Sequence, residues 1–141
     1  MNDLQDTPPL DDDALFEAFT TVRLAPDRFR HCEHVRVACI YLLRAGDLAS
    51  AAFEFRAALR RFVTVHGAAK LFHETLTWAY LVLIHERMMA ASYTSSLELI
   101  AANPDLLDHR GGALARYYDV GAITASPLAR SCFVLPGDPR L

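Results

Sequence analysis

The chain has no long hydrophobic run and few residues that break helices. Its 141 residues include only 6 glycines and 7 prolines, fewer than a largely disordered chain of this length would carry. The longest uninterrupted apolar stretch, residues 78–84, is far shorter than the roughly 20 residues needed to cross a bilayer. Residues 1–13 are acidic and lack the apolar segment of a signal peptide. We therefore expect a folded domain without a membrane span or secretion signal.

The chain also has few cysteines and a small net charge. The cysteines, Cys32, Cys39 and Cys132, are odd in number and have no C-x-x-C spacing, which favours reduced thiols and a cytoplasmic location. A net charge of −3 gives no general electrostatic reason to bind nucleic acid or anionic lipid. Gly111 and Gly112 lack the preceding strand that a phosphate-binding loop requires. We expect neither a nucleic-acid partner nor a membrane partner, and the oligomeric state stays open.

What the chain does have is a high apolar content, 52% of residues, arranged with the period of helices. Helix-start residues precede several of these segments, and Gly46 and Gly67 follow two of them. The pattern predicts an all-α, single-domain bundle of about five helices, with residues 1–10 as a flexible tail and residues 11–141 as the domain. The helices are expected after Asp11–Asp13 and over about 32–44, 47–65, 71–91 and 95–103, followed by short segments and an extended C-terminal tail.

The helix expected over residues 71–91 is apolar around most of its circumference. Such a helix is usually central and contacted on several sides. On the preceding helix, Arg56 and Arg60 fall one turn apart. We interpret these two arginines as a solvated face.

Two short segments supply the main candidates for chemistry: R-H-C-E-H, with His31 and His34, and F-H-E-T, with His73 and Glu74. His31 and His34 are three residues apart and share a helix face. Two packed helices can bring three imidazoles and a carboxylate to one point, which suits a divalent transition metal. We therefore predict His31, His34, His73 and Glu74 as metal ligands. In the alternative, Glu74 does not bind the metal but accepts a hydrogen bond from the second ring nitrogen of one of these histidines and thereby orients it.

The same residues fit two other hypotheses. In the first, a metal-free pocket binds or protonates a small acidic or carbonyl compound. In the second, His73 and Glu74 join Thr75 and Thr77 in a buried hydrogen-bond network that only holds the fold. The sequence favours none of the three strongly enough to assign a reaction or to decide whether the protein is an enzyme.

Three further residues complete the predicted site, a polar pocket between the second and fourth helices roofed by the C-terminal segment. Arg130 follows an apolar pair, so a buried guanidinium there needs a partner: Glu74, Glu33 or an anionic ligand. We predict Glu74 and Arg130 as the catalytic candidates, and Arg130 as a structural salt bridge in the alternative case. Trp78 lies one turn after Glu74 and, with Thr77, is expected to line the pocket around a small molecule.

Four segments together resemble a family of small, all-helical bacterial proteins of uncharacterised function. The family pattern is F-x-H-x-x-H, then Y-H-E-T-[I/L]-T, then Y-Y, then S-x-x-A-R-x-x-F and P-D. The matching segments are residues 29–34, 72–77, 117–118 and 126–133, followed by Pro136. Phe72 stands where the family has Tyr, and Gly137 lengthens the final P-D. The resemblance covers residues 15–141 and implies a helical fold with one His/Glu cluster, but no reaction.

Overall fold

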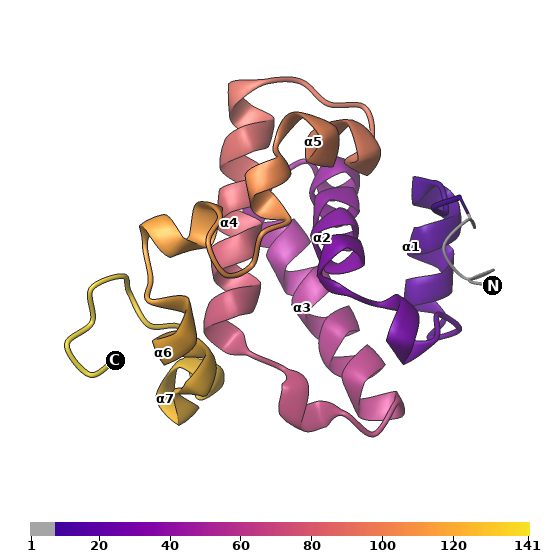
Figure 1. The fold of residues 1–141 in the computed structure, drawn as a ribbon. Helices are drawn as coiled ribbons and strands as arrows, with labels where there is room; N and C mark the ends of the chain where they lie inside the picture. The colour runs from indigo at the N-terminus through magenta and orange to yellow at the C-terminus, as the bar shows by residue number, and fades with distance from the viewer. Residues whose placement is uncertain (1–7) are drawn as a thin grey trace, which may run out of the picture.

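The computed structural model describes residues 8–141, which form helices and no β-strand. This confirms the predicted all-α class (Figure 1). The α-helices are α1 (Asp12–Thr20), α2 (His31–Ala45), α3 (Leu48–Val65), α4 (Glu74–Ala90), α5 (Ser96–Ala102), α6 (Val120–Ala125) and α7 (Pro127–Ser131). Short 3₁₀ turns lie between them: η1 (Pro26–Arg28), η2 (Ala69–Leu71), η3 (Pro104–Leu106) and η4 (Ala113–Arg116).

Helix boundaries follow from local cap chemistry. The Asp11 carboxylate accepts a hydrogen bond from the Ala14 amide (2.8 Å), and Asp47 does the same for Ser50 (2.8 Å). Such side chains satisfy amide groups that have no partner within the helix. Gly46 ends α2 with φ of 77°, a left-handed conformation that glycine adopts at little cost. These starts and stops are the ones that the sequence predicted.

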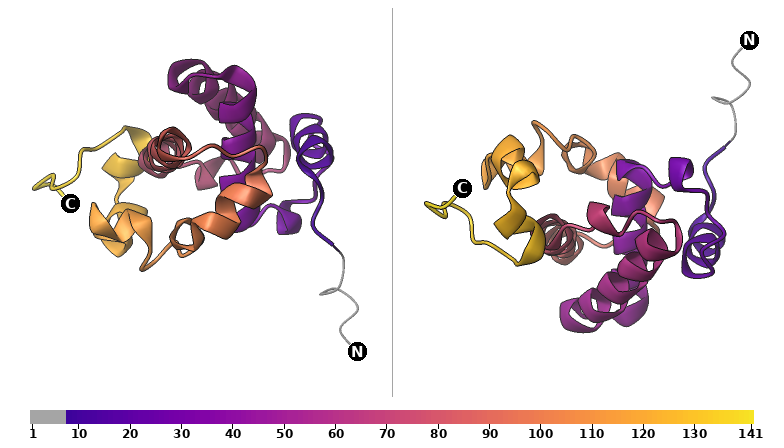
Figure 2. Two further views of the ribbon diagram at one scale, coloured as in Figure 1. Left: turned by 90° about the horizontal axis from the view of Figure 1, so that it is seen from above. Right: turned by 90° about the horizontal axis from the view of Figure 1, so that it is seen from below.

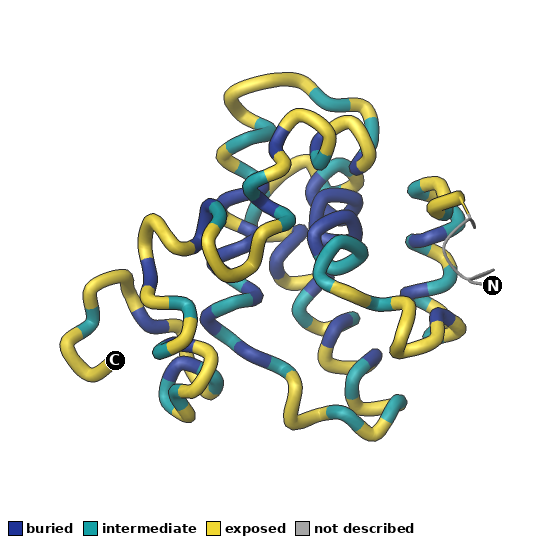
Figure 3. The backbone as a smooth tube through the Cα atoms, viewed as in Figure 1, coloured by how far each residue is buried: buried dark blue, intermediate teal, exposed yellow. Residues whose placement is uncertain are grey.

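The core is built around α2, which packs against α1, α3, α4 and α5. Every residue from 35 to 42 is buried, so this helix is covered over its whole circumference (Figure 3). One apolar face of α2 and one of α3 point into the core, since their apolar members are all buried. These residues are Val35, Ala38, Cys39, Leu42, Ala52, Phe55, Leu59 and Phe62.

A buried arginine ties the N-terminal end to the core. Arg36 is 2% exposed and donates to the Ser96 hydroxyl (2.8 Å), to the Leu10 carbonyl (2.6 Å) and to Asp12 (3.2 Å). Ser96 in turn donates to the Asp12 carboxylate. A buried cation requires such partners. Residues 1–7 of the expected flexible tail, residues 1–10, lie outside the described residues. Leu10, the last residue of this tail, is held by Arg36.

Helix α4 contacts α2, α3, α7 and η4, as expected for a helix that is apolar on several sides. The chain from η4 onward lies on the side of α4 away from α1, where α6 and α7 form a small corner (Figures 1 and 2). The expected extended tail is therefore preceded by two short helices, and Val134 within it is buried. Across residues 8–141, no helix combines the length and the apolar character that a membrane crossing needs.

Candidate functional site

His73 lies just before α4 rather than inside it, where the sequence analysis had placed it. Its Nδ1 accepts a hydrogen bond from the Leu76 amide (3.2 Å), so the ring caps the helix. Its Nε2 donates to the Ile123 carbonyl (2.8 Å). Burial lowers the pKa of His73, the bond to Ile123 opposes this, and the charge of Arg130 lowers it further. His73 is thus a neutral imidazole with both nitrogens occupied.

Glu74 is held by an ion pair that the sequence analysis missed. Arg56 donates to both carboxylate oxygens (2.7 and 3.1 Å), and the Trp78 indole donates to Oε1 (3.0 Å). Burial raises the pKa of Glu74, but the hydrogen bonds from Arg56 and Trp78 outweigh it, so the net shift is downward. Arg56 is partly exposed, as expected for a solvated face, but its guanidinium also forms a forked pair with a largely buried carboxylate.

The two threonines of the F-H-E-T-L-T segment also bond to backbone. The Thr75 hydroxyl lies 2.7 Å from the Ala129 carbonyl and 2.9 Å from the Cys132 carbonyl, and it accepts from the Val134 amide (3.1 Å). Thr77 donates to the His73 carbonyl one turn earlier (2.7 Å). Together with His73, Thr75 fastens the C-terminal segment to the first turn of α4. His73 and the two threonines are thus hydrogen-bonded within the protein, but in the described residues no bond joins them to Glu74 as the network hypothesis expects.

His31 opens α2 and faces the segment that follows α5. Its Nε2 lies 2.8 Å from the Leu106 carbonyl, and its ring centroid is 4.9 Å from that of Tyr80 and 5.3 Å from that of His109. Burial lowers the pKa of His31, opposed by the Leu106 hydrogen bond. The Tyr80 hydroxyl is buried with no hydrogen-bond partner among the described residues. This cluster joins α2 to α4 through rings rather than through ion pairs.

His34 lies one turn further along α2, among aromatic rings. It stacks on Phe29 (centroids 5.5 Å apart) and is tilted against Phe55 (5.5 Å). Its Nε2 is buried and has no hydrogen-bond partner in the described part of the chain. Burial, with a contribution from nearby His31, lowers the pKa of His34 to about 4. The imidazole is therefore neutral at physiological pH.

The predicted metal cluster does not form. Within residues 8–141, no three His, Cys, Asp or Glu side chains are grouped so that they could hold one ion. The expected convergence of His31, His34, His73 and Glu74 is wrong because each has other neighbours: backbone carbonyls for His31 and His73, rings for His34, and Arg56 for Glu74. Between the second and fourth helices, the His31 ring lies against the Tyr80 ring.

Arg130 reaches three backbone carbonyls instead of a carboxylate. It donates to the carbonyls of Lys70 (2.9 Å), Phe72 (3.5 Å) and Thr124 (3.2 Å). The described residues offer it no ion pair, so the predicted salt bridge to Glu74 or Glu33 is wrong. Its three bonds leave part of the guanidinium's donor capacity free. Arg130 thus brings positive charge to the α3–α4 link without a protein anion to balance it.

Glu74 and Arg130 nevertheless line one pocket, between α7 and the α3–α4 link that contains Lys70. Its volume is about 280 Å³. Arg60 and Lys70 line it as well, and the Arg60 guanidinium lies 5.0 Å from the Phe72 ring centroid. We call this the basic pocket; it is lined by Arg60, Val63, Thr64, Ala69, Lys70, Phe72, Glu74, Arg130 and Ser131.

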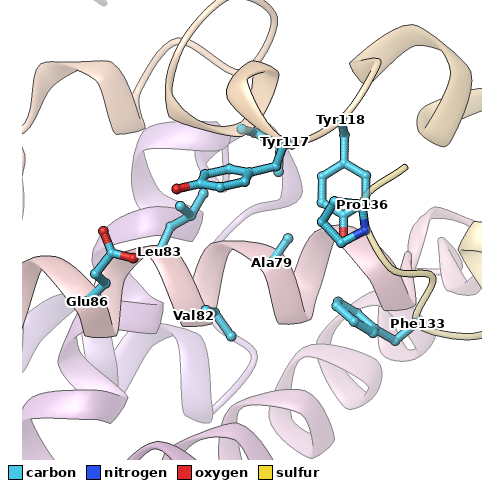
Figure 4. A pocket seen from close by; sticks show the side chains of 9 residues that line it. Ala79, Val82, Leu83, Glu86, Tyr117, Tyr118, Phe133 and Pro136 are labelled. Carbon is cyan, nitrogen blue, oxygen red and sulfur yellow. The ribbon is translucent and has the colours of Figure 1, made fainter. Parts of the chain in front are cut away.

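Two other hollows are mainly apolar. The Tyr118 pocket, of about 240 Å³, lies between α4 and the C-terminal segment, with Glu86 toward one end and Phe133 and Pro136 toward the other (Figure 4). Tyr118 is fixed there by donating to the Val134 carbonyl (2.8 Å). The Phe53 pocket, of about 650 Å³, opens over α3 and the start of α4. It is lined by Leu48, Ala49, Phe53, Arg56, Ala57, Glu74 and Trp78.

Arg60 and Lys70 line the pocket but are not among the ligand contacts predicted from the sequence. Lys70 is the only lysine among the chain's 14 basic residues, and it follows α3 by a few residues. Basic residues on both sides of the Gly67 break were the available signal, because a tight link brings them close together. Thr77, predicted to contact a ligand, is 2% exposed and bonds within α4. Trp78 lines the Phe53 pocket.

Comparison with known proteins adds no relative: no family model matches the chain, and neither the curated proteins nor the solved structures contain a match. The resemblance to a bacterial family therefore stays a prediction.

Proposed function

We propose that this protein binds a small anionic ligand, carrying a phosphate or carboxylate group, in the basic pocket without a metal. The observation behind the proposal is the imbalance of charge there. Arg60, Lys70 and Arg130 line the pocket, and its one carboxylate, Glu74, is already neutralised by Arg56. In the described residues neither Arg60 nor Lys70 has an ion-pair partner. In a chain of net charge −3, such a cluster of cations favours an external anion.

The pocket also offers shape and directionality. Arginine can form paired hydrogen bonds with a phosphate or carboxylate, while lysine acts as a more compact charge. Arg60 is oriented over the Phe72 ring, and Arg130 is fixed by three carbonyls. These restraints lower the entropy cost of placing the cations around a ligand. The proposal assigns binding only, because Glu74 is an ionised, paired carboxylate and thus a poor proton donor.

Isothermal titration with inorganic phosphate and acetate, at low salt and neutral pH, tests the proposal. Arg60→Gln should weaken binding by about 10-fold or more, since it removes an unpaired cation from the pocket. Arg61→Gln is the matched control: Arg61 is the next residue on α3, but it donates to the Thr20 carbonyl (3.4 Å) and does not line the pocket. Binding should also fall as salt rises.

Two results would contradict the proposal. One is the lack of any heat of binding with either anion, together with equal behaviour of the Arg60 and Arg61 variants. The other is a rise in melting temperature with zinc, manganese, nickel or iron that a chelator reverses, which would restore the metal hypothesis. A reduced cytoplasmic setting belongs to the proposal as well, supported by the three free thiols.

A further inference from the structure

The basic pocket and the Phe53 pocket meet at one side chain. Glu74 lines both, and the Arg56–Glu74 pair lies where they join. The two pockets differ in chemistry: the first is bordered by three cations, whereas the second is apolar apart from this ion pair. The adjacency means that one ligand can contact both.

A single helix face runs beneath both pockets. On α3, Ala49, Phe53 and Ala57 line the Phe53 pocket, and Arg60 and Thr64 line the basic pocket. These positions recur every three or four residues, so they lie along one side of the helix. From residue 49 to residue 60 the helix rises by ~16 Å. The face therefore changes from apolar to basic over the length of an extended acyl chain.

Phe53 shows that the apolar half is not covered by the protein itself. Its side chain is 78% exposed, although the neighbouring Phe55 is fully buried in the core. A large exposed ring beside a half-buried tryptophan is typical of a binding surface. Contact with an apolar group would remove this surface from water and favour binding.

We propose that this face binds an amphiphilic anion, with its carboxylate or phosphate in the basic pocket and its unbranched apolar tail in the Phe53 pocket. This inference rests on the proposed function, since it uses the same cations for the head group. The Arg56–Glu74 pair permits the tail to cross, because each charge already satisfies the other and neither is left unpaired by apolar contact. The charge at only one end of the face sets the orientation of the ligand.

Titration with acetate, octanoate and dodecanoate, below micelle-forming concentrations, separates the two parts of the proposal. The dissociation constant should fall by about 10-fold or more from acetate to dodecanoate, because each added methylene leaves water. Trp78, the only tryptophan, reports on the Phe53 pocket. Its emission should change with dodecanoate and not with acetate.

Variants on each half of the face give distinct expectations. Phe53→Ser should abolish most of the gain from chain length and leave acetate and phosphate binding unchanged. Met89→Ser is the matched control, because Met89 is 74% exposed on α4 but lines neither pocket. Arg60→Gln should weaken binding of all the anions. Dodecyl alcohol, which has the tail without the charge, should bind more weakly than dodecanoate.

The outcomes distinguish failure of this inference from failure of the proposed function. If acetate and phosphate bind through Arg60 but chain length and Trp78 emission have no effect, the inference is overturned and the proposed function stands. If no anion binds, both fail. If dodecyl alcohol binds as tightly as dodecanoate, the role of charge is overturned. A dimer that Phe53→Ser dissociates and dodecanoate leaves intact would assign the face to a second copy of the chain instead.

Discussion

The segments R-H-C-E-H and F-H-E-T both place His and Glu at the start of a helix, yet the protein satisfies the polar atoms of these side chains to different degrees. In F-H-E-T, both nitrogens of His73 are bonded and Glu74 accepts from two side chains. In R-H-C-E-H, the Nε2 of His34 has no partner among the described residues, and Glu33 accepts only from the Arg30 amide (3.2 Å).

The difference comes from what packs against each helix start. Backbone carbonyls from residues 123–132 reach the first turn of α4, so polar side chains there find acceptors. At the start of α2, His31 reaches the Leu106 carbonyl, but His34 lies between aromatic rings and packs as an apolar ring would. F-H-E-T therefore stabilises the fold through hydrogen bonds, whereas His34 of R-H-C-E-H makes the stability of the fold sensitive to pH.

Replacing His73 or His34 by phenylalanine should give the largest difference in stability between the two segments. His73→Phe removes the cap on the Leu76 amide and leaves the Ile123 carbonyl unpaired, so the free energy of unfolding should fall by about 3–5 kcal/mol. His34→Phe keeps a ring between Phe29 and Phe55 and removes an unpaired buried nitrogen, so it should change stability by less than about 1 kcal/mol at pH 7.5. Urea denaturation followed by circular dichroism measures both. Equal losses for the two variants would contradict the contrast.

Acid should destabilise the wild-type protein more than the His34→Phe variant. The pKa of His34 is lowered from 6.5 to about 4, so the folded state resists a proton that the unfolded chain takes up. The stabilising effect is complete above pH 6.5 and is lost as pH falls from there toward 4. The difference between the two proteins should reach about 3 kcal/mol by pH 4. Denaturation midpoints across this range test it; parallel pH curves for the two proteins would count against the burial of a neutral His34.

The smallest contrast concerns the two carboxylates. Glu74→Gln removes the charge facing Arg56 and weakens the bond from Trp78, which should cost about 1 kcal/mol, since the Arg56 side chain is partly exposed. Glu33→Gln should cost less than about 0.5 kcal/mol, because that carboxylate accepts a single exposed hydrogen bond. Thermal unfolding at pH 7.5 compares them, and Trp78 emission should shift only in the Glu74 variant. A larger loss for Glu33→Gln would reverse the ranking of the two segments.

The helices were predictable because their signals are local. Apolar spacing and cap residues such as Asp11 and Asp47 act within one or two turns, and they placed α1 to α5 within a few residues. The start of α4 was misplaced because histidine is an unusual cap, and its role depends on a ring nitrogen accepting from the Leu76 amide. Local patterns do not report such a contact.

The site was less predictable, because its partners are backbone carbonyls. Any residue type offers a carbonyl, so nothing in the sequence marks Ile123 as the acceptor for His73 or Thr124 as an acceptor for Arg130. A histidine that can bind a metal can equally well donate a hydrogen bond to a backbone carbonyl, and the fold determines which of the two partners lies near it. The sequence did single out Glu74 and Arg130, which line the basic pocket, but it did not indicate Arg60 and Lys70.

The bonds between α4 and the C-terminal segment also constrain the order of events during synthesis. His73 bonds to a residue 50 positions later, and Thr75 to one 59 positions later. Closing loops of this length carries an entropic cost that the neighbouring helix contacts do not. While the ribosome still holds residues 120–134, the amino-terminal helices can pair but the first turn of α4 cannot complete its bonds. The bonds between α4 and residues 123–134 are therefore expected to form last and most slowly, after the amino-terminal helices have paired.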